Sequence, residues 1–118
     1  MRLVNLTPHA IVVFDGDRAL ATFPPSGRFA RLRESHRLSA PLAASGVEIP
    51  TVDVAYEEMV DDLPDQVEGT AYIVSRVLAA AVERDDLYFP FDEVRDVDGR
   101  IVGCRALGRF TANGIPDA

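Results

Sequence analysis

The sequence has a single cysteine, Cys104, and no lysine. One cysteine excludes an intrachain disulfide framework and a cysteine-rich zinc site. We expect this residue to be a small buried hydrophobic group in a protein of the reducing cytoplasm. All 12 basic residues are arginine, which either reflects a GC-rich coding bias or suits the recognition of carboxylates and phosphates.

Several signatures of function are also missing. The first five residues show no apolar stretch or cleavage site of a signal peptide,, and no apolar run approaches the roughly 18 residues of a membrane span. There is no glycine-rich phosphate loop and no Gly-x-Ser-x-Gly elbow,. The two histidines lack partners at the spacing of zinc ligands. We therefore expect no membrane contact, no metal and no cofactor, and the catalytic residues, if the chain has any, are unknown.

The length and charge of the chain indicate one acidic domain. With 118 residues, the chain is near the usual domain size, and we assign residues 1–110 to the domain and residues 111–118 to a C-terminal tail. The formal net charge is −7, but residues 48–68 contain eight acids and no base, so the rest sums to +1. Because a broad basic surface is absent, we expect no nucleic-acid partner. The eight acids are Glu48, Asp53, Glu57, Glu58, Asp61, Asp62, Asp65 and Glu68.

Short strands dominate the pattern. Asp15-Gly16 and Asp98-Gly99 each predict a hairpin turn between two apolar segments,. We expect loops over 34–46, which is rich in Ser, Ala, Pro and Gly, and over 56–68, which is acidic and alternatively forms a ragged helical turn. The predicted strands cover 2–6, 10–14, 18–23, 28–33, 47–55, 70–74, 87–89, 93–97 and 100–107.

One helix is predicted, and its start is marked by a capping residue. Ser75 is a suitable N-cap, and the apolar residues Val77, Leu78, Ala81 and Val82 recur at helical spacing,, so we expect a helix from Arg76 to about residue 83. The sequence therefore predicts an α+β fold, a mostly antiparallel sheet with one main helix packed on one face.

Several motifs together resemble a family of small bacterial and phage proteins that has no assigned activity. The resemblance spans nearly the whole chain and implies a cytoplasmic protein, a prophage or host-conflict accessory. Its motifs are the opening Val4-Asn5-Leu6-Thr7-Pro8-His9, the Pro25-Ser26-Gly27 loop, the Tyr72-Ile73-Val74-Ser75 segment and the closing residues from Arg84-Asp85-Asp86-Leu87 to Gly103-Cys104-Arg105.

The first candidate site is the polar cluster near the N-terminus. Asn5, Thr7 and His9 alternate, which places them on the same side of an extended segment,. An amide, a hydroxyl and an imidazole so arranged orient a ligand or serve as acid or base. The alternative is a turn in which Asn5 and Thr7 bond to the backbone and His9 lies on the surface.

The second candidate is the start of the helix. Unpaired backbone N–H groups at a helix N-terminus bind anions, and Ser75 and Arg76 add a hydroxyl and a charged fork,. The alternative is an ordinary N-cap.

Two further pairs complete the candidate ligand site. Ser26 and Arg28 follow two prolines that stiffen their loop,, although the segment also suits an ordinary turn. Arg84 and Asp85 lie at the end of the helix, where a carboxylate either binds a ribose diol or a cation or pairs with arginine.

The leading functional hypothesis is therefore a binding protein for a small anionic, nucleotide-derived ligand. A second hypothesis is a small hydrolase or transferase in which His9 acts with Ser26 or Ser75. A third is an oligomeric structural or interaction protein without a small-molecule site, in which the acidic segment is a binding surface or a solubilising face and exposed sheet edges favour homo-oligomers.

Overall fold

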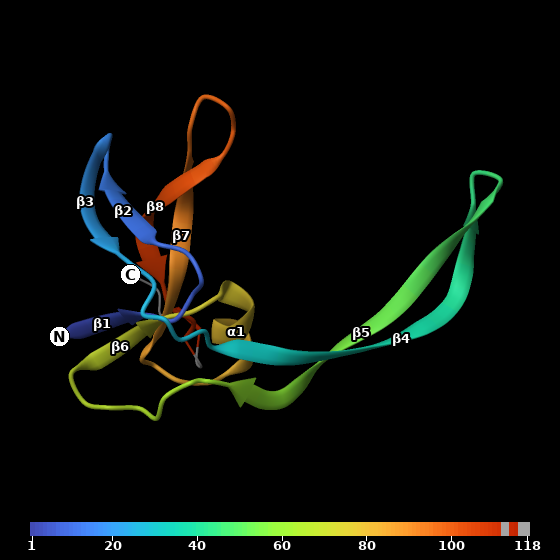
Figure 1. Ribbon diagram of the computed structural model, residues 1–118, viewed down its shortest axis with the longest axis horizontal. Helices are drawn as coiled ribbons and strands as arrows, with labels where there is room; N and C mark the ends of the chain where they lie inside the picture. The colour runs from blue at the N-terminus through green and yellow to red at the C-terminus, as the bar shows by residue number, and fades with distance from the viewer. Residues whose placement is uncertain (112–113, 116–118) are drawn as a thin grey trace.

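A computed structural model describes residues 1–111 and 114–115 and consists of a twisted sheet with a long projecting hairpin (Figure 1). The sheet has six strands in the order β1-β6-β7-β8-β2-β3, and the hairpin is a separate two-stranded sheet, β4-β5. The strands are β1 (Arg2–Asn5), β2 (Ile11–Asp15), β3 (Arg18–Phe23), β4 (Arg31–Ala44), β5 (Val47–Asp61), β6 (Thr70–Ile73), β7 (Leu87–Arg95) and β8 (Ile101–Gly108).

The six-stranded sheet is mixed rather than mostly antiparallel. β6 pairs in parallel with both β1 and β7, and β2 is parallel to β8. The two hairpins expected from Asp-Gly signals, β2-β3 and β7-β8, are antiparallel. In the first of them the turn residues are Gly16 and Asp17, and Gly16 takes the positive φ of 60° that this tight turn requires,.

The helix begins where expected and ends about two residues earlier. α1 (Arg76–Ala81) has six residues, and Ser75 is its N-cap, as predicted, because the Ser75 hydroxyl accepts a hydrogen bond from the Leu78 N–H at 3.2 Å. The chain leaves the helix at Val82, which is in an extended conformation. Of the described residues, 58% are in strands and 5% in helix. The prediction of an α+β fold with one main helix is therefore wrong, and the protein is mostly β.

Two predicted loops are strands. Residues 34–44 belong to β4 and residues 56–61 to β5, and the two strands pair over almost their whole length. The first segment contains Pro41 and the second is acidic,, so local composition pointed to a loop. Long cross-strand pairing overrides this preference. β7 likewise continues through Pro90, beyond the predicted strand at 87–89.

The core lies where α1 packs on the parallel half of the sheet. Leu6, Val74, Leu78 and Leu87 are almost fully buried there, with Phe89 beside them. Leu32 and Val60, which face each other at the base of the hairpin, pack against this core. The hairpin is thus anchored in the core by its first apolar pair.

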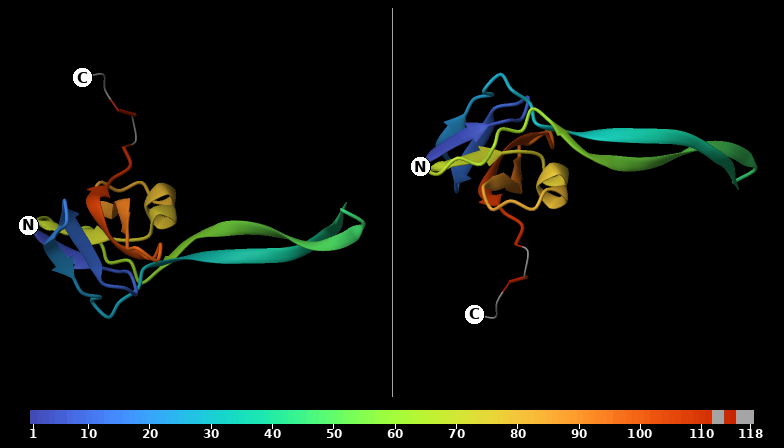
Figure 2. Two further views of the ribbon diagram at one scale, coloured as in Figure 1. Left: turned by 90° about the horizontal axis from the view of Figure 1, so that it is seen from above. Right: turned by 90° about the horizontal axis from the view of Figure 1, so that it is seen from below.

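The hairpin β4-β5, with its turn at Ser45-Gly46, is hereafter the arm. It extends away from the sheet and remains clear of it in the views from above and below (Figure 2). The radius of gyration is 17.8 Å, against about 13 Å for a compact domain of this length, and the arm contributes to this excess. No helix among the described residues has the length and hydropathy of a membrane span.

The domain boundaries remain a prediction. Residues 112–113 and 116–118 of the expected tail at 111–118 lie outside the described residues.

The close contact between β8 and β2 makes Gly103 a test of the sheet packing. A methyl group at Gly103 would lie 2.5 Å from both the Val12 carbonyl oxygen and the Phe14 ring. We expect Gly103→Ala to lower the free energy of unfolding by about 1–3 kcal/mol in urea titrations. The control is Gly16→Ala, whose methyl group meets open space and which costs about 1 kcal/mol through backbone strain. Equal stability of Gly103→Ala and the parent would contradict this packing.

Candidate interaction surface

Asn5 is a structural clamp at the end of β1. Its side chain is buried, with 2% of the residue exposed, and its amide donates to the carbonyl oxygens of His9 at 2.7 Å and Phe23 at 2.9 Å. Its Oδ1 accepts hydrogen bonds from the Thr7 N–H at 2.9 Å and the Thr7 hydroxyl at 2.7 Å. The amide is therefore fully engaged within the protein, in the turn arrangement that was the alternative to a ligand site.

His9 and Ser26 lie in the loops that this clamp connects. The His9 residue is exposed, and its backbone carbonyl, not its ring, joins the network. The Ser26 N–H donates to the Asn5 carbonyl oxygen at 3.0 Å, and the Ser26 hydroxyl accepts from the Arg28 N–H at 3.3 Å. The structure thus brings Asn5, Thr7, His9 and Ser26 together, and the hydrogen bonds among them connect the loops to each other.

Arg28 joins the two chain segments that flank the arm. Its guanidinium donates to Asp62 Oδ1 from two nitrogens, at 2.7 and 2.9 Å, just beyond the end of β5. This hydrogen-bonded pair raises the pKa of Arg28. The contact is partly exposed, and it holds the two ends of the hairpin together where the arm begins.

Ser75 and Arg76 serve the short helix and an aromatic cluster. Ser75 caps α1, while the Arg76 guanidinium carbon lies 5.2 Å from the centre of the Phe89 ring and 5.8 Å from that of Phe110. These two rings stack on each other with centroids 4.9 Å apart. The arginine therefore covers aromatic surface by a cation–π contact.

Arg84 and Asp85 also bond within the fold. Arg84 forms a two-pronged ion pair with Asp86 at 2.6 and 2.9 Å and donates to the Pro64 carbonyl oxygen at 3.0 Å. The hydrogen bonds to Asp86 raise the pKa of Arg84. Asp85 Oδ1 accepts from the Gln66 side-chain amide at 2.6 Å.

Two surface hollows lie away from the N-terminal cluster. One, of about 750 Å³, runs along the end of α1 and includes Arg84 and Asp85 in its lining. The other, of about 480 Å³, lies beside β6 and includes Asp85 and Arg109. Neither is lined by Asn5, Thr7, His9, Ser26 or Ser75, so neither unites the two halves of the predicted ligand site. Among the described residues no group of His, Cys, Asp or Glu side chains is placed to hold a metal ion.

The arm carries the largest set of exposed apolar side chains outside the core region. Residues directly opposite each other in an antiparallel pair share a face. The register shifts once after Leu32-Val60, and the pairs Glu34-Tyr56, His36-Val54 and Leu38-Val52 then follow at every second residue of each strand. We call this the apolar face. It begins as core at the base and runs outward into solvent, where Leu38 is 78% exposed and Val54 is 54% exposed.

The opposite face of the arm is polar. Its cross-strand pairs include Arg37-Asp53, joined by an ion pair at 3.7 Å, and Ser39-Thr51, whose hydroxyls lie 2.6 Å apart. Near the base, Arg33 binds Asp61 at 2.8 Å and lowers the pKa of that carboxyl through its hydrogen bonds. The arm is therefore an amphipathic ribbon with one face made for burial.

Sequence reasoning missed this surface, although a signal for it was present. In 52–56 the apolar residues Val52, Val54 and Tyr56 alternate with Asp53 and Ala55, which is the period-2 pattern of a half-buried strand,. The prediction of a strand over 47–55 included part of it. The partner strand was hidden because Leu38 is the only large apolar residue between 33 and 41.

The Asn5 clamp makes a prediction about stability. Asn5→Ala leaves the carbonyl oxygens of His9 and Phe23 without their donors, and we expect it to lower the free energy of unfolding by about 1–3 kcal/mol in urea titrations. His9→Ala is the control, because an exposed ring contributes about 0.5 kcal/mol or less. Wild-type stability of Asn5→Ala would contradict the structural role.

Cys104 provides a second prediction. It is buried in β8, its thiol lies 3.7 Å from the Val12 carbonyl oxygen, and burial raises its pKa. Because the thiolate is the reactive form, a thiol-specific chromogenic reagent at pH 8 is expected to label the native protein at least tenfold more slowly than the protein in denaturant. Equal rates would show that the β2-β8 contact opens readily.

Comparisons with known proteins find no relative of this chain. No family model matches the chain, and no curated protein and no solved structure is significantly similar to it. The resemblance to a family of small bacterial and phage proteins therefore stays a prediction, as do the anionic ligand and the catalytic use of His9.

Proposed function

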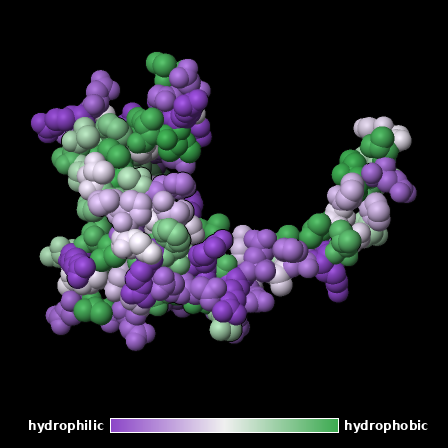
Figure 3. All heavy atoms as spheres, viewed as in Figure 1, coloured by the Kyte–Doolittle hydropathy of each residue, from purple (hydrophilic) through white to green (hydrophobic). Residues whose placement is uncertain are grey.

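We propose that this protein is a self-assembling structural protein whose copies associate through the β4-β5 arm. The observation that carries the proposal is the apolar face, which is continuous with the core at Leu32 and Val60 and then extends into solvent. Hydrophobic residues are exposed along the arm among hydrophilic ones in the space-filling view (Figure 3). A second copy of the chain is the occupant to which the proposal commits.

The exposed part of the apolar face is a patch of the size that marks interaction sites. Leu38, Val52, Val54 and Tyr56 on this face are between 48% and 78% exposed, and together they expose on the order of 400 Å², about half of the roughly 800 Å² that one partner contributes to a standard interface. Exposed apolar patches of a few hundred Å² on soluble proteins mark interaction sites.

The physical state of the arm also favours a partner. A two-stranded ribbon is marginally stable in water on its own, and β4 and β5 together contain 29 residues that gain little from the body beyond the base. Burial against another copy supplies the missing stabilisation. A cytoplasmic location belongs to this proposal, since a single free cysteine suits a reducing compartment,.

The proposal is tested by placing the same charge on either face of the arm. The wild-type protein is expected to be oligomeric at micromolar concentration in light scattering coupled to size exclusion. Val54→Asp puts a carboxylate on the apolar face, and we expect it to weaken association at least tenfold, because the buried carboxylate loses its water. Circular dichroism checks that the variant stays folded.

The matched control is the neighbouring residue. Ala55→Asp adds the same carboxylate one position along β5, on the polar face, and is expected to leave the mass of the assembly unchanged. A wild-type protein that is still monomeric at about 100 μM, well above the micromolar concentration at which association is expected, would overturn the proposal. Equal disruption by both variants would show that charge, not the apolar face, controls association.

A further inference from the structure

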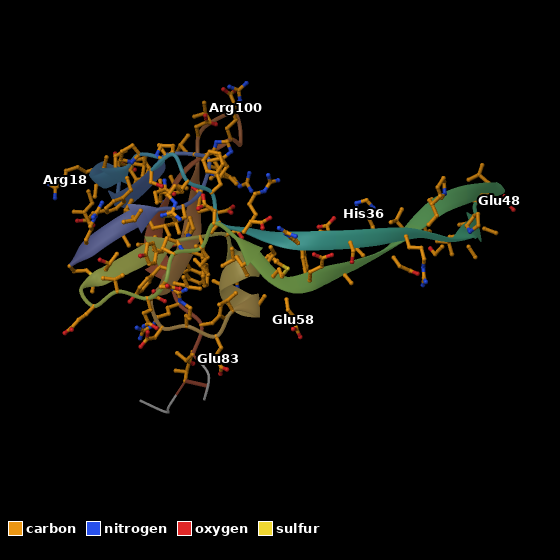
Figure 4. All side chains as sticks on the ribbon, turned by 60° about the horizontal axis from the view of Figure 1, so that its bottom comes forward. Arg18, His36, Glu48, Glu58, Glu83 and Arg100 are labelled. Atoms are coloured by element: carbon orange, nitrogen blue, oxygen red, sulfur yellow. The ribbon has the colours of Figure 1, made fainter. Side chains whose placement is uncertain are left out.

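The two strands of the arm carry opposite charge. β4 contains Arg31, Arg33 and Arg37 against the single acid Glu34. β5 contains no base, and its acids project along the arm, as the labelled Glu48 and Glu58 illustrate (Figure 4). Each strand pairs with the other along one edge and leaves the second edge free. One free edge of the arm is therefore basic and the other is acidic.

The ion pairs within the arm involve only some of these charged side chains. Arg33 and Arg37 bind Asp61 and Asp53 across the hairpin. In the residues that the structure covers, no ion pair involves Arg31 on β4 or Glu57 and Glu58 on β5. Charge of complementary sign thus remains available on the two sides of the ribbon.

The symmetry of a contact between two arms follows from these signs. A twofold contact joins like edges, β4 with β4 or β5 with β5, and places arginines against arginines or carboxylates against carboxylates. A head-to-tail contact joins the β4 edge of one copy to the β5 edge of the next. In that arrangement neighbouring strands are antiparallel and their charges are opposite.

Prolines limit where such pairing takes place. Pro41 in β4 and Pro50 in β5 lack an N–H donor,, and proline on an edge blocks strand addition. The part of the arm nearer the body, 31–39 and 51–61, contains no proline. This proline-free part is also the part that carries the charged residues Arg33, Arg37 and Asp53.

We propose that the arms of successive copies pair side by side, the basic β4 edge of one against the acidic β5 edge of the next, and close into a ring with the apolar face turned inward. This inference rests on the proposed self-assembly and specifies its geometry. Closing a sheet removes its free edges and buries one face. An eight-stranded closed sheet has an interior that side chains just fill, and about four arms would supply it.

A charge-reversed arm tests the edge pairing. Reversing both cross-strand ion pairs keeps each pair intact within the arm, and neutralising Glu57 and Glu58 in addition makes the β4 edge acidic and the β5 edge basic over the proline-free part. In head-to-tail assembly the reversed chain joins its own copies, but both of its edges repel the wild-type edges. The reversed chain carries Arg33→Glu, Arg37→Glu, Asp53→Arg, Glu57→Gln, Glu58→Gln and Asp61→Arg.

The experiment measures how often wild-type and reversed chains occur in the same assembly. Wild-type and reversed chains, one of them labelled with heavy nitrogen, are unfolded, combined and refolded, and native mass spectrometry counts the species. We expect each chain alone to form assemblies of three or more copies and mixed assemblies to fall roughly tenfold below random mixing, since several like-charge contacts act together. Labelled and unlabelled wild-type chains, which mix at random, are the control.

Other outcomes separate this inference from the proposed function. A wild-type dimer in which reversed and wild-type chains pair preferentially would show a twofold contact and overturn the head-to-tail geometry, while self-assembly through the arm stands. Random mixing would likewise overturn the role of charge. A monomeric wild-type protein would overturn both this inference and the proposed self-assembly. If the reversed chain fails to fold, two half-reversed chains replace it, one with the β4 substitutions alone and one with the β5 substitutions alone. Assembly that occurs only in their mixture is the supporting result.

Discussion

The side-chain amide of Asn5 joins three stretches of chain, and the placement of the arm depends on it. Its hydrogen bonds connect the end of β1 to the turn at His9 and to the end of β3 at Phe23. The same strand end then receives the Ser26 N–H, and Leu6 receives that of Ala30. These contacts lead the chain into β4 at a fixed point, and the arm starts from a rigid base.

The sequence identified much of the sheet and little of the arm. The hairpins β2-β3 and β7-β8 were predicted because Asp-Gly turns flanked by apolar residues are strong local signals. The Ser75 cap was also predicted from a local signal, a serine directly before apolar residues at helical spacing. The length of α1 was not, because the stripe from Val77 to Val82 fits a longer helix, whereas the chain turns extended at Val82 to reach β7.

The candidate ligand site shows why polar residues near strand ends are ambiguous. The alternation of Asn5, Thr7 and His9 places three functional groups together in the sequence, but only the fold determines which carbonyl groups need donors. Here the carbonyl oxygens of His9 and Phe23 take both protons of the amide. The arm was missed for the opposite reason, since its strands are held by partners across the ribbon and its core contact is confined to one pair at the base.

The separation of the arm from the core gives it a different energetic character from the rest of the chain. Backbone hydrogen bonds along a solvated ribbon open at low cost, whereas those of a buried strand such as β6 open at higher cost,. Under the proposed self-assembly the arm would respond to concentration: its amide protons would exchange rapidly in dilute solution and become protected as copies associate. The share of protected arms would then report the concentration of the chain.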